Sequence, residues 1–210
     1  SGWYDDCLIG SLENFSALTD GARQPDACPA QRMVIGPWLH GGAGQRRIGD
    51  FDYGIEAEID VADLQRRWFD ARLQGKVDPS PPVQLFVMGR NSWLEEHEWP
   101  ITRTNYVPYY LHSCGRANTR HGDGTLSTTH PDAEASDTFV YDPSNPVPYC
   151  SNFDWQQVGG PDDCAELELR EDVLVYTSPP LSEALLICGP LKVRCSTAST
   201  KSTSRRCVTT

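Results

Sequence analysis

The spacing of apolar residues changes along the chain, and this change divides it into two parts. In the first part, two groups of apolar residues recur at helical spacing: Leu8, Leu12, Phe15 and Leu18, then Val61, Leu64, Trp68 and Leu73. The short apolar run 32–35 lies between them and is typical of a buried parallel strand, which Gly36 and Pro37 are expected to end. A further strand is expected just before Asp5.

The second part consists of short β-like runs separated by loops rich in Pro and Asp. These runs cover 83–88, 109–111, 138–141, 172–176, 185–188 and 191–194. They favour an antiparallel sandwich of the jelly-roll type. The Pro-rich stretch 76–82 reads as a linker, so we divide the chain into an α/β part, 1–79, and a β part, 80–210. The Ser/Thr-rich tail 196–210 is expected to be poorly ordered.

The two expected parallel strands are each followed by a side chain that can move or hold a proton. Asp5 follows the first strand and His40 follows the second. An acid followed by a His is the order in which α/β-hydrolases present the last two members of a Ser, Asp, His triad. In such a triad the carboxylate fixes the imidazole tautomer, and the imidazole takes the proton of the nucleophile.

Each candidate also has a purely structural interpretation. A His after a strand is more often a packed loop residue than a catalyst. Asp6, next to Asp5, is interpreted as a favourable charge at a helix start. Three aromatic residues could line an acyl pocket but could equally pack in the core: Trp3, Tyr4 and Trp38. The other histidines are interpreted as loop residues: His97, His112, His121 and His130.

Composition excludes several classes of partner. A formal net charge of −11 disfavours binding to nucleic acid and to anionic membranes, and no apolar run is long enough to span a bilayer. The eight cysteines form no Cys-x-x-Cys pair, so no zinc site or other cofactor is expected, and their pairing stays open. Because the chain begins Ser-Gly-Trp without Met, we expect a truncated N-terminus, and the cellular compartment stays undetermined.

Several motifs occur in an order found in one group of enzymes. They lie at 2–5, 36–41, 67–70 with 73–75, 82–89, 93 with 98–100, 137–143 and 172–176. With them the sequence resembles the C-terminal portion of the cocaine esterase and Xaa-Pro dipeptidyl-peptidase group of serine hydrolases. The resemblance implies an α/β-hydrolase segment, 1–79, that carries the catalytic acid Asp5 and the catalytic base His40. It also implies an incomplete jelly-roll (galactose-binding-like) sandwich from about residue 80 onward.

The resemblance further implies hydrolysis of small ester, amide or peptide substrates through an acyl-enzyme. In the α-amino-acid ester hydrolases of this group, acidic residues follow the catalytic Asp by two and three positions. Cys7 and Leu8 stand there in this chain, which favours an esterase, glutaryl acylase or peptidase-like member. No Gly-x-Ser-x-Gly elbow is present, so we expect the nucleophile to precede Ser1 or to come from a separate polypeptide, and the isolated chain to be inactive.

An alternative function is a non-catalytic β-sandwich that binds a carbohydrate or a partner chain, or that forms homo-oligomers. A carbohydrate platform would need exposed aromatic rings, for which Trp93, Trp99 and Trp155 are the candidates. The abrupt change of composition at Cys195 suggests a truncated or frame-shifted reading of the C-terminus. Substrate identity and oligomeric state are not determined by the sequence.

Overall fold

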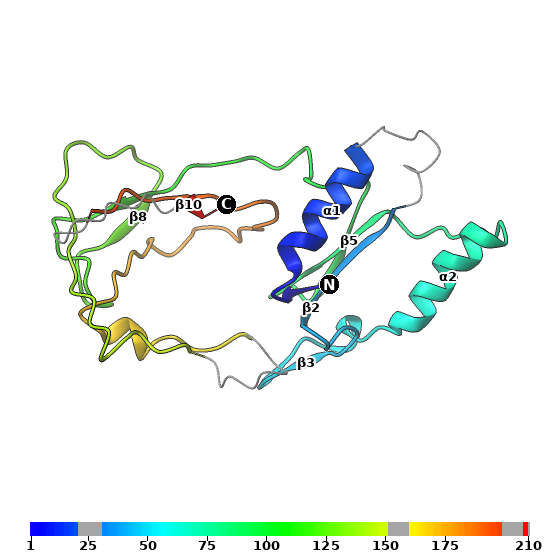
Figure 1. The fold of residues 1–210 in the computed structure, drawn as a ribbon. Coiled ribbons are helices and arrows are strands. Elements are labelled where there is room, and N and C mark those ends of the chain that lie inside the picture. The colour runs from blue at the N-terminus through cyan, green and yellow to red at the C-terminus, as the bar shows by residue number, and fades with distance from the viewer. Residues whose placement is uncertain (21–30, 151–159, 199–207, 210) are drawn as a thin grey trace.

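The fold is taken from a computed structural model, which describes residues 1–20, 31–150, 160–198 and 208–209. Both α-helices and the largest sheet lie on one side of the molecule, and short strands joined by long loops lie on the other (Figure 1). Over the described residues, the chain is mostly β and loop with few helices. No helix within these ranges has the length and apolar character to cross a bilayer.

The largest sheet has four strands in the order β1-β2-β5-β6. They are β1 (Gly2–Tyr4), β2 (Met33–Leu39), β5 (Val83–Val87) and β6 (Ser92–Glu96). The first three are parallel, and β6 returns antiparallel to β5. The parallel strand expected before residue 36 is therefore confirmed. The run at 83, which the periodicity assigned to the β part, lies in this sheet beside β2.

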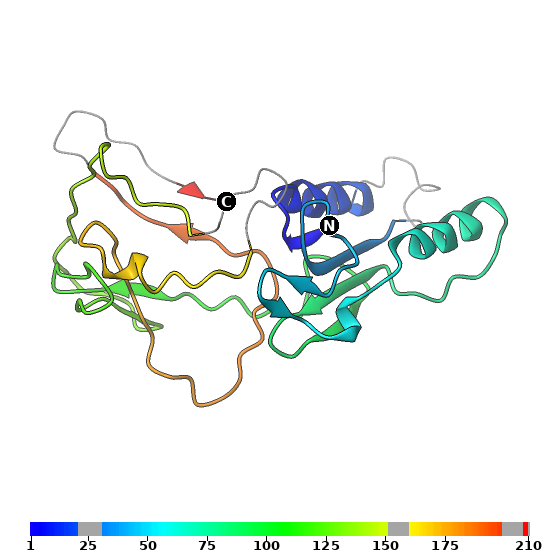
Figure 2. The same cartoon turned by 90° about the horizontal axis from the view of Figure 1, so that it is seen from below.

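Helix α1 (Leu8–Asp20) covers one face of the sheet (Figure 2). Phe15 is buried there, and Leu8 and Leu12 pack against the same core. Strands β2 and β5 contribute Met33, Ile35, Val83 and Leu85 to this core. The segment after β6 contributes Trp99 and Ile101. Leu18, expected in the same apolar stripe, is instead exposed.

The opposite face of the sheet is covered by a short hairpin and one helical turn. The elements are β3 (Arg47–Ile48), β4 (Phe51–Asp52) and the 3-10 turn η2 (Ile55–Ala57). Leu39 and Phe86 from the sheet form a second buried cluster with Ile48, Tyr53 and Ala57. The two faces of the sheet thus each have a separate apolar core.

Gly36 and Pro37 do not end the strand, contrary to the prediction, because β2 runs on to Leu39. The register with β1 shifts between Gly2 and Tyr4, and this irregularity admits a proline, which cannot donate a ladder hydrogen bond. Gly36 is needed here because a Cβ at this position would overlap the ring of Trp38. His40 therefore follows a longer strand than expected.

Helix α2 (Val61–Leu73) has the predicted extent. Asp60 caps its N-terminus by accepting a hydrogen bond from the backbone N–H of Asp63 at 3.0 Å, and Gly75 adopts a positive φ just after the helix. None of its residues is buried, and Figure 1 shows the helix at the outer end of the molecule. The helix is thus stabilised by its cap and by surface ion pairs more than by packing.

The strands of the β part lie at positions that only partly agree with the runs that the sequence predicts. Strands β5 and β6 of this part belong to the four-stranded sheet. The other paired strands among its described residues are β7 (Tyr110–His112) with β8 (Thr125–Ser127), and β9 (Val193–Arg194) with β10 (Val208–Thr209). The runs 138–141 and 185–188 are not strands, and 172–176 takes part only through an isolated bridge at Leu174. Val140 and Ile187 are mostly exposed. Their side chains favour strands, but a strand also needs burial of those side chains, which is missing at these positions. Most of the tail 196–210 falls outside the described residues, although the pairing of β10 was not anticipated.

Side-chain hydrogen bonds hold the long loops of the β part together. Asp137 accepts from the hydroxyls of Ser113 and Tyr176, both at 2.6 Å, and from the backbone N–H of Ala117 at 2.8 Å. Cys150 and Cys164 are joined by a disulfide, a pairing that the sequence left open. Such contacts give the loops a defined shape without a continuous sheet.

Two contacts connect the β part with the four-stranded sheet. Arg103 binds the buried carboxylate of Glu96, with Nη1 at 2.6 Å from Oε2. The hydroxyl of Thr104 donates to the carbonyl of Cys188 at 3.2 Å, and the Cys188 side chain packs against the core beneath α1. The first contact is local, and the second joins residues 84 positions apart in the sequence.

Candidate functional site

The ends of β1 and β2 bring Asp5 and His40 together. Because the strands are parallel neighbours, the residues that follow them emerge at the same edge of the sheet. Asp5 Oδ1 lies 3.0 Å from His40 Nδ1, although 35 positions separate the two residues in the sequence. The predicted meeting of the carboxylate and the imidazole is therefore confirmed.

Three donors hold the Asp5 carboxylate in place. Oδ1 accepts from His40 and also from the backbone N–H of Cys7, the second at 2.9 Å. Oδ2 accepts from the Ser1 hydroxyl at 2.9 Å. Partial burial alone would raise the pKa of Asp5, but these hydrogen bonds and the charge of His40 outweigh it and lower the pKa to about 2. Asp5 is thus a fixed anion at neutral pH.

His40 is held at one ring nitrogen and open at the other. Its pKa is raised, first by the hydrogen bond with Asp5 and then by the charges of Asp5 and Asp6. Because an ionised carboxylate can only accept hydrogen bonds, Nδ1 carries a proton and donates a hydrogen bond to Asp5. Nε2 is then available as a base, and the His40 side chain is 59% exposed. This arrangement can take up a proton and stabilise the resulting imidazolium.

The structure adds two residues to this site that the sequence interpretation did not assign to it. Asp6 Oδ1 lies 3.2 Å from His40 Nδ1, whereas we had interpreted Asp6 as a helix-start charge. Cys7 follows directly, and its ligand atom lies within 4.8 Å of those of the other three residues. Because α1 begins only at Leu8, residues 5–7 form a tight turn facing His40. Their adjacency in the sequence was the available signal.

The three aromatic residues proposed for an acyl pocket use their polar atoms in internal contacts. Trp3 Nε1 donates to the carbonyl of Phe86 at 2.7 Å, and the Tyr4 and Tyr53 hydroxyls are 2.9 Å apart. Trp38 is buried, and its Nε1 donates to a backbone carbonyl at 3.1 Å. In this structure all three contribute to packing around the pair, and a role in substrate binding stays a prediction.

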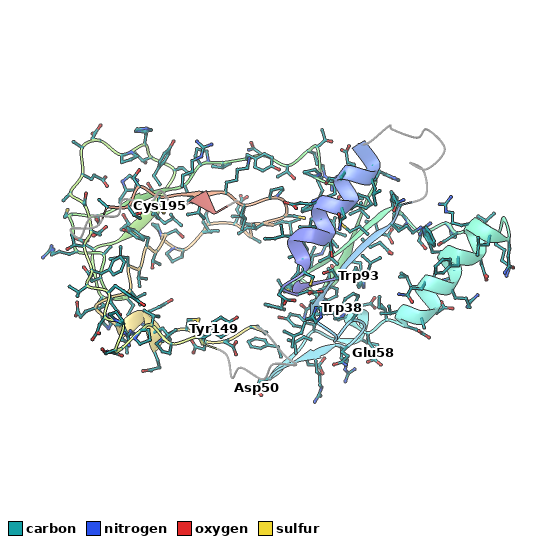
Figure 3. All side chains as sticks on the ribbon, in the orientation of Figure 1. Trp38, Asp50, Glu58, Trp93, Tyr149 and Cys195 are labelled. Carbon is teal, nitrogen blue, oxygen red and sulfur yellow. A yellow bond between two sulfur atoms is a disulfide. The ribbon has the colours of Figure 1, made fainter. Side chains whose placement is uncertain are left out.

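Two of the three tryptophans considered for a carbohydrate platform can be located. Trp99 is buried in the core beneath α1. Trp93 lies next to Trp38, with ring centroids 5.9 Å apart (Figure 3), and its Nε1 bonds to the carbonyl of Glu56. Trp155 lies outside the described residues. Trp93 and Trp99 therefore do not form an exposed platform.

A second His–carboxylate pair in the β part, not anticipated from the sequence, resembles a triad in its connections. His112 Nδ1 lies 2.7 Å from Glu134, and its Nε2 lies 3.1 Å from Ser127 Oγ. However, Nε2 also lies 3.0 Å from the carbonyl of Thr129, which can only accept, so Nε2 must carry a proton. His112 is thus a clamp between loops and not a base for Ser127.

Two shallow cavities lie elsewhere in the described structure. One, of about 310 Å³, runs between α2 and the sheet and includes Asp63, Arg67 and Trp93. The other, of about 430 Å³, lies in the β part and includes Arg116, His121 and Asp123 in its lining. Neither of these two cavities is lined by Asp5 or His40.

Comparison with known proteins adds a family assignment to this geometry. Residues 75–209 match the family described as the X-Pro dipeptidyl-peptidase C-terminal non-catalytic domain. The larger part of the chain is therefore a domain of this class. The chain belongs to the family of the X-Pro dipeptidyl-peptidase C-terminal domain and is similar to a cocaine esterase over most of its own length.

Two relatives illustrate the extent of the likeness. The chain is 37% identical over 202 residues to the cocaine esterase of Rhodococcus sp. (strain MB1 Bresler), a match that covers 92% of this chain and 34% of that protein. The crystal structure of an aminopeptidase from a marine sediment archaeon, Thaumarchaeota archaeon, matches with a TM-score of 0.61 and 27% identity, over 87% of this chain and 30% of that one. The chain thus spans about a third of the length of these relatives.

Proposed function

We propose that Asp5 and His40 are the acid and base of a serine hydrolase that cleaves esters or amides through an acyl-enzyme. The observation that carries this proposal is the 3.0 Å contact between Asp5 and His40 Nδ1 at the ends of two parallel strands. It leaves Nε2 for the nucleophile, as the geometry of a Ser, His, Asp triad requires. The order of acid before base in the chain is that of the α/β-hydrolases. The serine and the oxyanion hole would come from another part of the hydrolase.

The proposed mechanism assigns a separate task to each residue. His40 Nε2 takes the proton of the serine hydroxyl as its oxygen attacks the substrate carbonyl carbon. Asp5 stabilises the imidazolium, which then gives its proton to the leaving alcohol or amine as the bond to the carbonyl breaks. Water, deprotonated by the same nitrogen, hydrolyses the acyl-enzyme and releases the acid.

The proposal includes the finer architecture of the two parts. Residues 1–79 would be a segment of an α/β-hydrolase domain, which the parallel pair of strands β1 and β2 and the covering helix α1 support. Residues 80–210 would be a jelly-roll domain, which the family match over 75–209 supports. The proposed substrate class is that of the similar proteins, an esterase and an aminopeptidase.

A chimera tests this assignment. The matching third of the Rhodococcus cocaine esterase is replaced by this chain, and kcat/KM is measured with p-nitrophenyl esters. We expect measurable activity that His40→Ala lowers by at least about 10³-fold and Asp5→Asn by a comparable factor. Serine-directed fluorophosphonate labelling should slow in parallel. Activity and labelling that survive both substitutions would refute the proposal, and the chain alone should remain unlabelled.

A second candidate function is a non-catalytic module, which the match of residues 75–209 to a non-catalytic domain family favours. In that case the β part serves assembly or binding, and Asp5 and His40 are irrelevant to it. Sedimentation equilibrium of the whole chain tests this idea for self-association. A dimer that is unaffected by His40→Ala would favour the module, whereas a monomer at all concentrations would remove self-assembly from consideration.

A further inference from the structure

Asp5, Asp6, Cys7 and His40 bring four potential metal ligands to one point on the surface. One ligand atom from each residue lies within 4.8 Å of the ligand atoms of the other three. The set contains an imidazole and a thiol as well as two carboxylates, so it is not simply an acidic cluster. Nitrogen, thiolate sulfur and carboxylate oxygen are the ligands that Zn²⁺ takes in proteins.

Two distances within the cluster, both from His40, are close to those of a tetrahedral site. Bonds of about 2.0 to 2.3 Å to Zn²⁺ place two ligands of a tetrahedron roughly 3.3 to 3.8 Å apart. His40 Nδ1 lies 3.0 Å from Asp5 Oδ1 and 3.2 Å from Asp6 Oδ1. Both separations need to grow by only a few tenths of an ångström. The same nitrogen therefore already faces two carboxylate oxygens at nearly the required spacing.

The backbone gives this cluster a mixture of rigidity and freedom. Asp5 and His40 are fixed by the ends of neighbouring parallel strands, and the Asp5 side chain is only 12% exposed. Asp6 and Cys7 lie in the turn before α1 and are exposed, so their side chains can rotate without disturbing a core. An ion can also reach the site directly from solvent, because the His40 ring is largely exposed.

Charge also favours a cation at this point. Asp5 and Asp6 place two carboxylates against a single imidazole. At the comparable pair in the β part, one carboxylate meets His112, and a backbone carbonyl takes the other ring nitrogen. The site at His40 therefore has an excess of anionic ligands that the site at His112 lacks.

We propose that Asp5, Asp6, Cys7 and His40 form a zinc-binding site. The ion replaces the proton on His40 Nδ1 and the proton on the Cys7 thiol, and both protons pass to solvent. The Cys spacing in the sequence gave no sign of this site, because its ligands come from two segments about 35 residues apart. Zinc would break the hydrogen bond between His40 and Asp5, so it would inhibit the hydrolase, a consequence that rests on the proposed function.

Cobalt(II) substitution tests the site in the whole chain, kept reduced with a phosphine. We expect one equivalent of Co²⁺ to give the intense visible bands of tetrahedral cobalt and a thiolate-to-cobalt charge-transfer band, and one equivalent of Zn²⁺ to remove both. Cys7→Ser should abolish the charge-transfer band. Competition titration should show that Cys7→Ser and His40→Ala each weaken zinc binding by at least about tenfold.

The matched controls are Cys114→Ser, which removes another exposed free thiol, and His121→Ala, which removes a histidine of the β part. Neither should change the bands or the affinity. Asp6→Asn, at an exposed turn residue, gives a second variant with little risk to folding and should also weaken binding. A charge-transfer band that persists in Cys7→Ser, or affinities unchanged in His40→Ala and Asp6→Asn, would overturn the proposal. Because no substrate is used, this outcome is independent of the hydrolase test.

Discussion

At the residue scale, the Asp5 carboxylate determines the behaviour of His40. It accepts hydrogen bonds from the ring, from a backbone N–H and from a hydroxyl, and so stays ionised over the whole neutral range. An anion held this firmly fixes the tautomer of the imidazole and favours its protonation. The site can therefore be tested without any substrate, through the titration of His40.

We predict that Asp5→Asn lowers the pKa of His40. The substitution removes the hydrogen bond to a charged acceptor and the charge itself, which are the two largest causes of the raised pKa. The amide oxygen can still accept from Cys7, so the turn should persist. The measurement is NMR titration of the His40 ring protons. Asp6→Asn is the matched control and should lower the pKa less, and a larger fall for Asp6→Asn would contradict this ranking.

The Asp5–His40 contact could be predicted from the sequence, but the approach of Asp6 and Cys7 could not. The first follows from backbone geometry, since parallel neighbours must end at the same edge. The second depends on how a three-residue turn folds before α1 and on the rotamers chosen there. Apolar periodicity carries no information on either, because both residues are polar and exposed.

His112 provides a second residue-scale test, in which pH affects local stability. Its pKa is raised, first by the hydrogen bond to Glu134, so the folded clamp binds its proton more tightly than the unfolded chain does. The stabilisation is fully present below the ordinary His pKa of about 6.5 and is lost as pH rises through the higher folded value. We predict that hydrogen exchange in residues 125–137 differs most between wild type and His112→Gln at low pH.

The comparison of the two proteins at each pH removes the intrinsic pH dependence of exchange. His97→Gln, at an exposed histidine outside the clamp, should behave as wild type throughout. A difference between wild type and His112→Gln that stays constant from pH 5 to pH 9 would show that the His112 charge is irrelevant to the clamp.

At the element scale, packing decides where a strand ends more than local propensity does. Gly36 and Pro37 are sequence signals for a strand end, yet β2 passes through both and reaches Leu39. The bulge against β1 accommodates the proline, and the missing side chain of Gly36 leaves room for the Trp38 ring. This longer strand carries His40 to the edge where Asp5 lies.

We predict that Gly36→Ala lowers the free energy of unfolding by about 1 to 3 kcal/mol, the usual cost of overpacking a core. A Cβ there would overlap the buried Trp38 ring, which must shift. Urea unfolding followed by tryptophan fluorescence measures the change. Gly10→Ala is the matched control: it lies on α1 with no atom within 4 Å of its Cβ and should raise stability by about 0.5 to 1 kcal/mol. Equal effects of the two substitutions would refute the packing argument.

The helices were easier to predict from the sequence than the β strands. The apolar spacing and the flanking Asp60 and Gly75 define α2 locally, so its bounds follow from the sequence. A strand is stable only beside a partner, and the apolar runs at 138–141 and 185–188 lack one within the described structure. Whether a β-like run becomes a strand depends on contacts that no single run encodes.

At the scale of the whole molecule, the connection between the sheet and the chain that follows β6 depends on particular contacts among the described residues. The pair between Glu96 and Arg103 is prominent among them, because Glu96 is buried at the end of β6 and Arg103 belongs to the segment that leads away from the sheet. The sequence shows neither the pairing nor the burial, since both residues lie in polar stretches. A charged group in this position needs its partner.

We predict that Arg103→Met lowers the urea midpoint of the whole chain, because it leaves the Glu96 carboxylate buried without its cation. Arg103 is itself largely exposed, so water screens part of the loss and the effect should be smaller than for a fully buried pair. Adding Glu96→Gln to Arg103→Met should restore most of the midpoint, since a neutral amide is cheaper to bury than a carboxylate.

Arg116→Met, which removes an exposed partner of Asp123 at 3.4 Å, should leave the midpoint unchanged. If the double variant is as unstable as the sum of the single variants, the two residues act independently, and the connection between the two parts must depend on the contact between Thr104 and Cys188 instead.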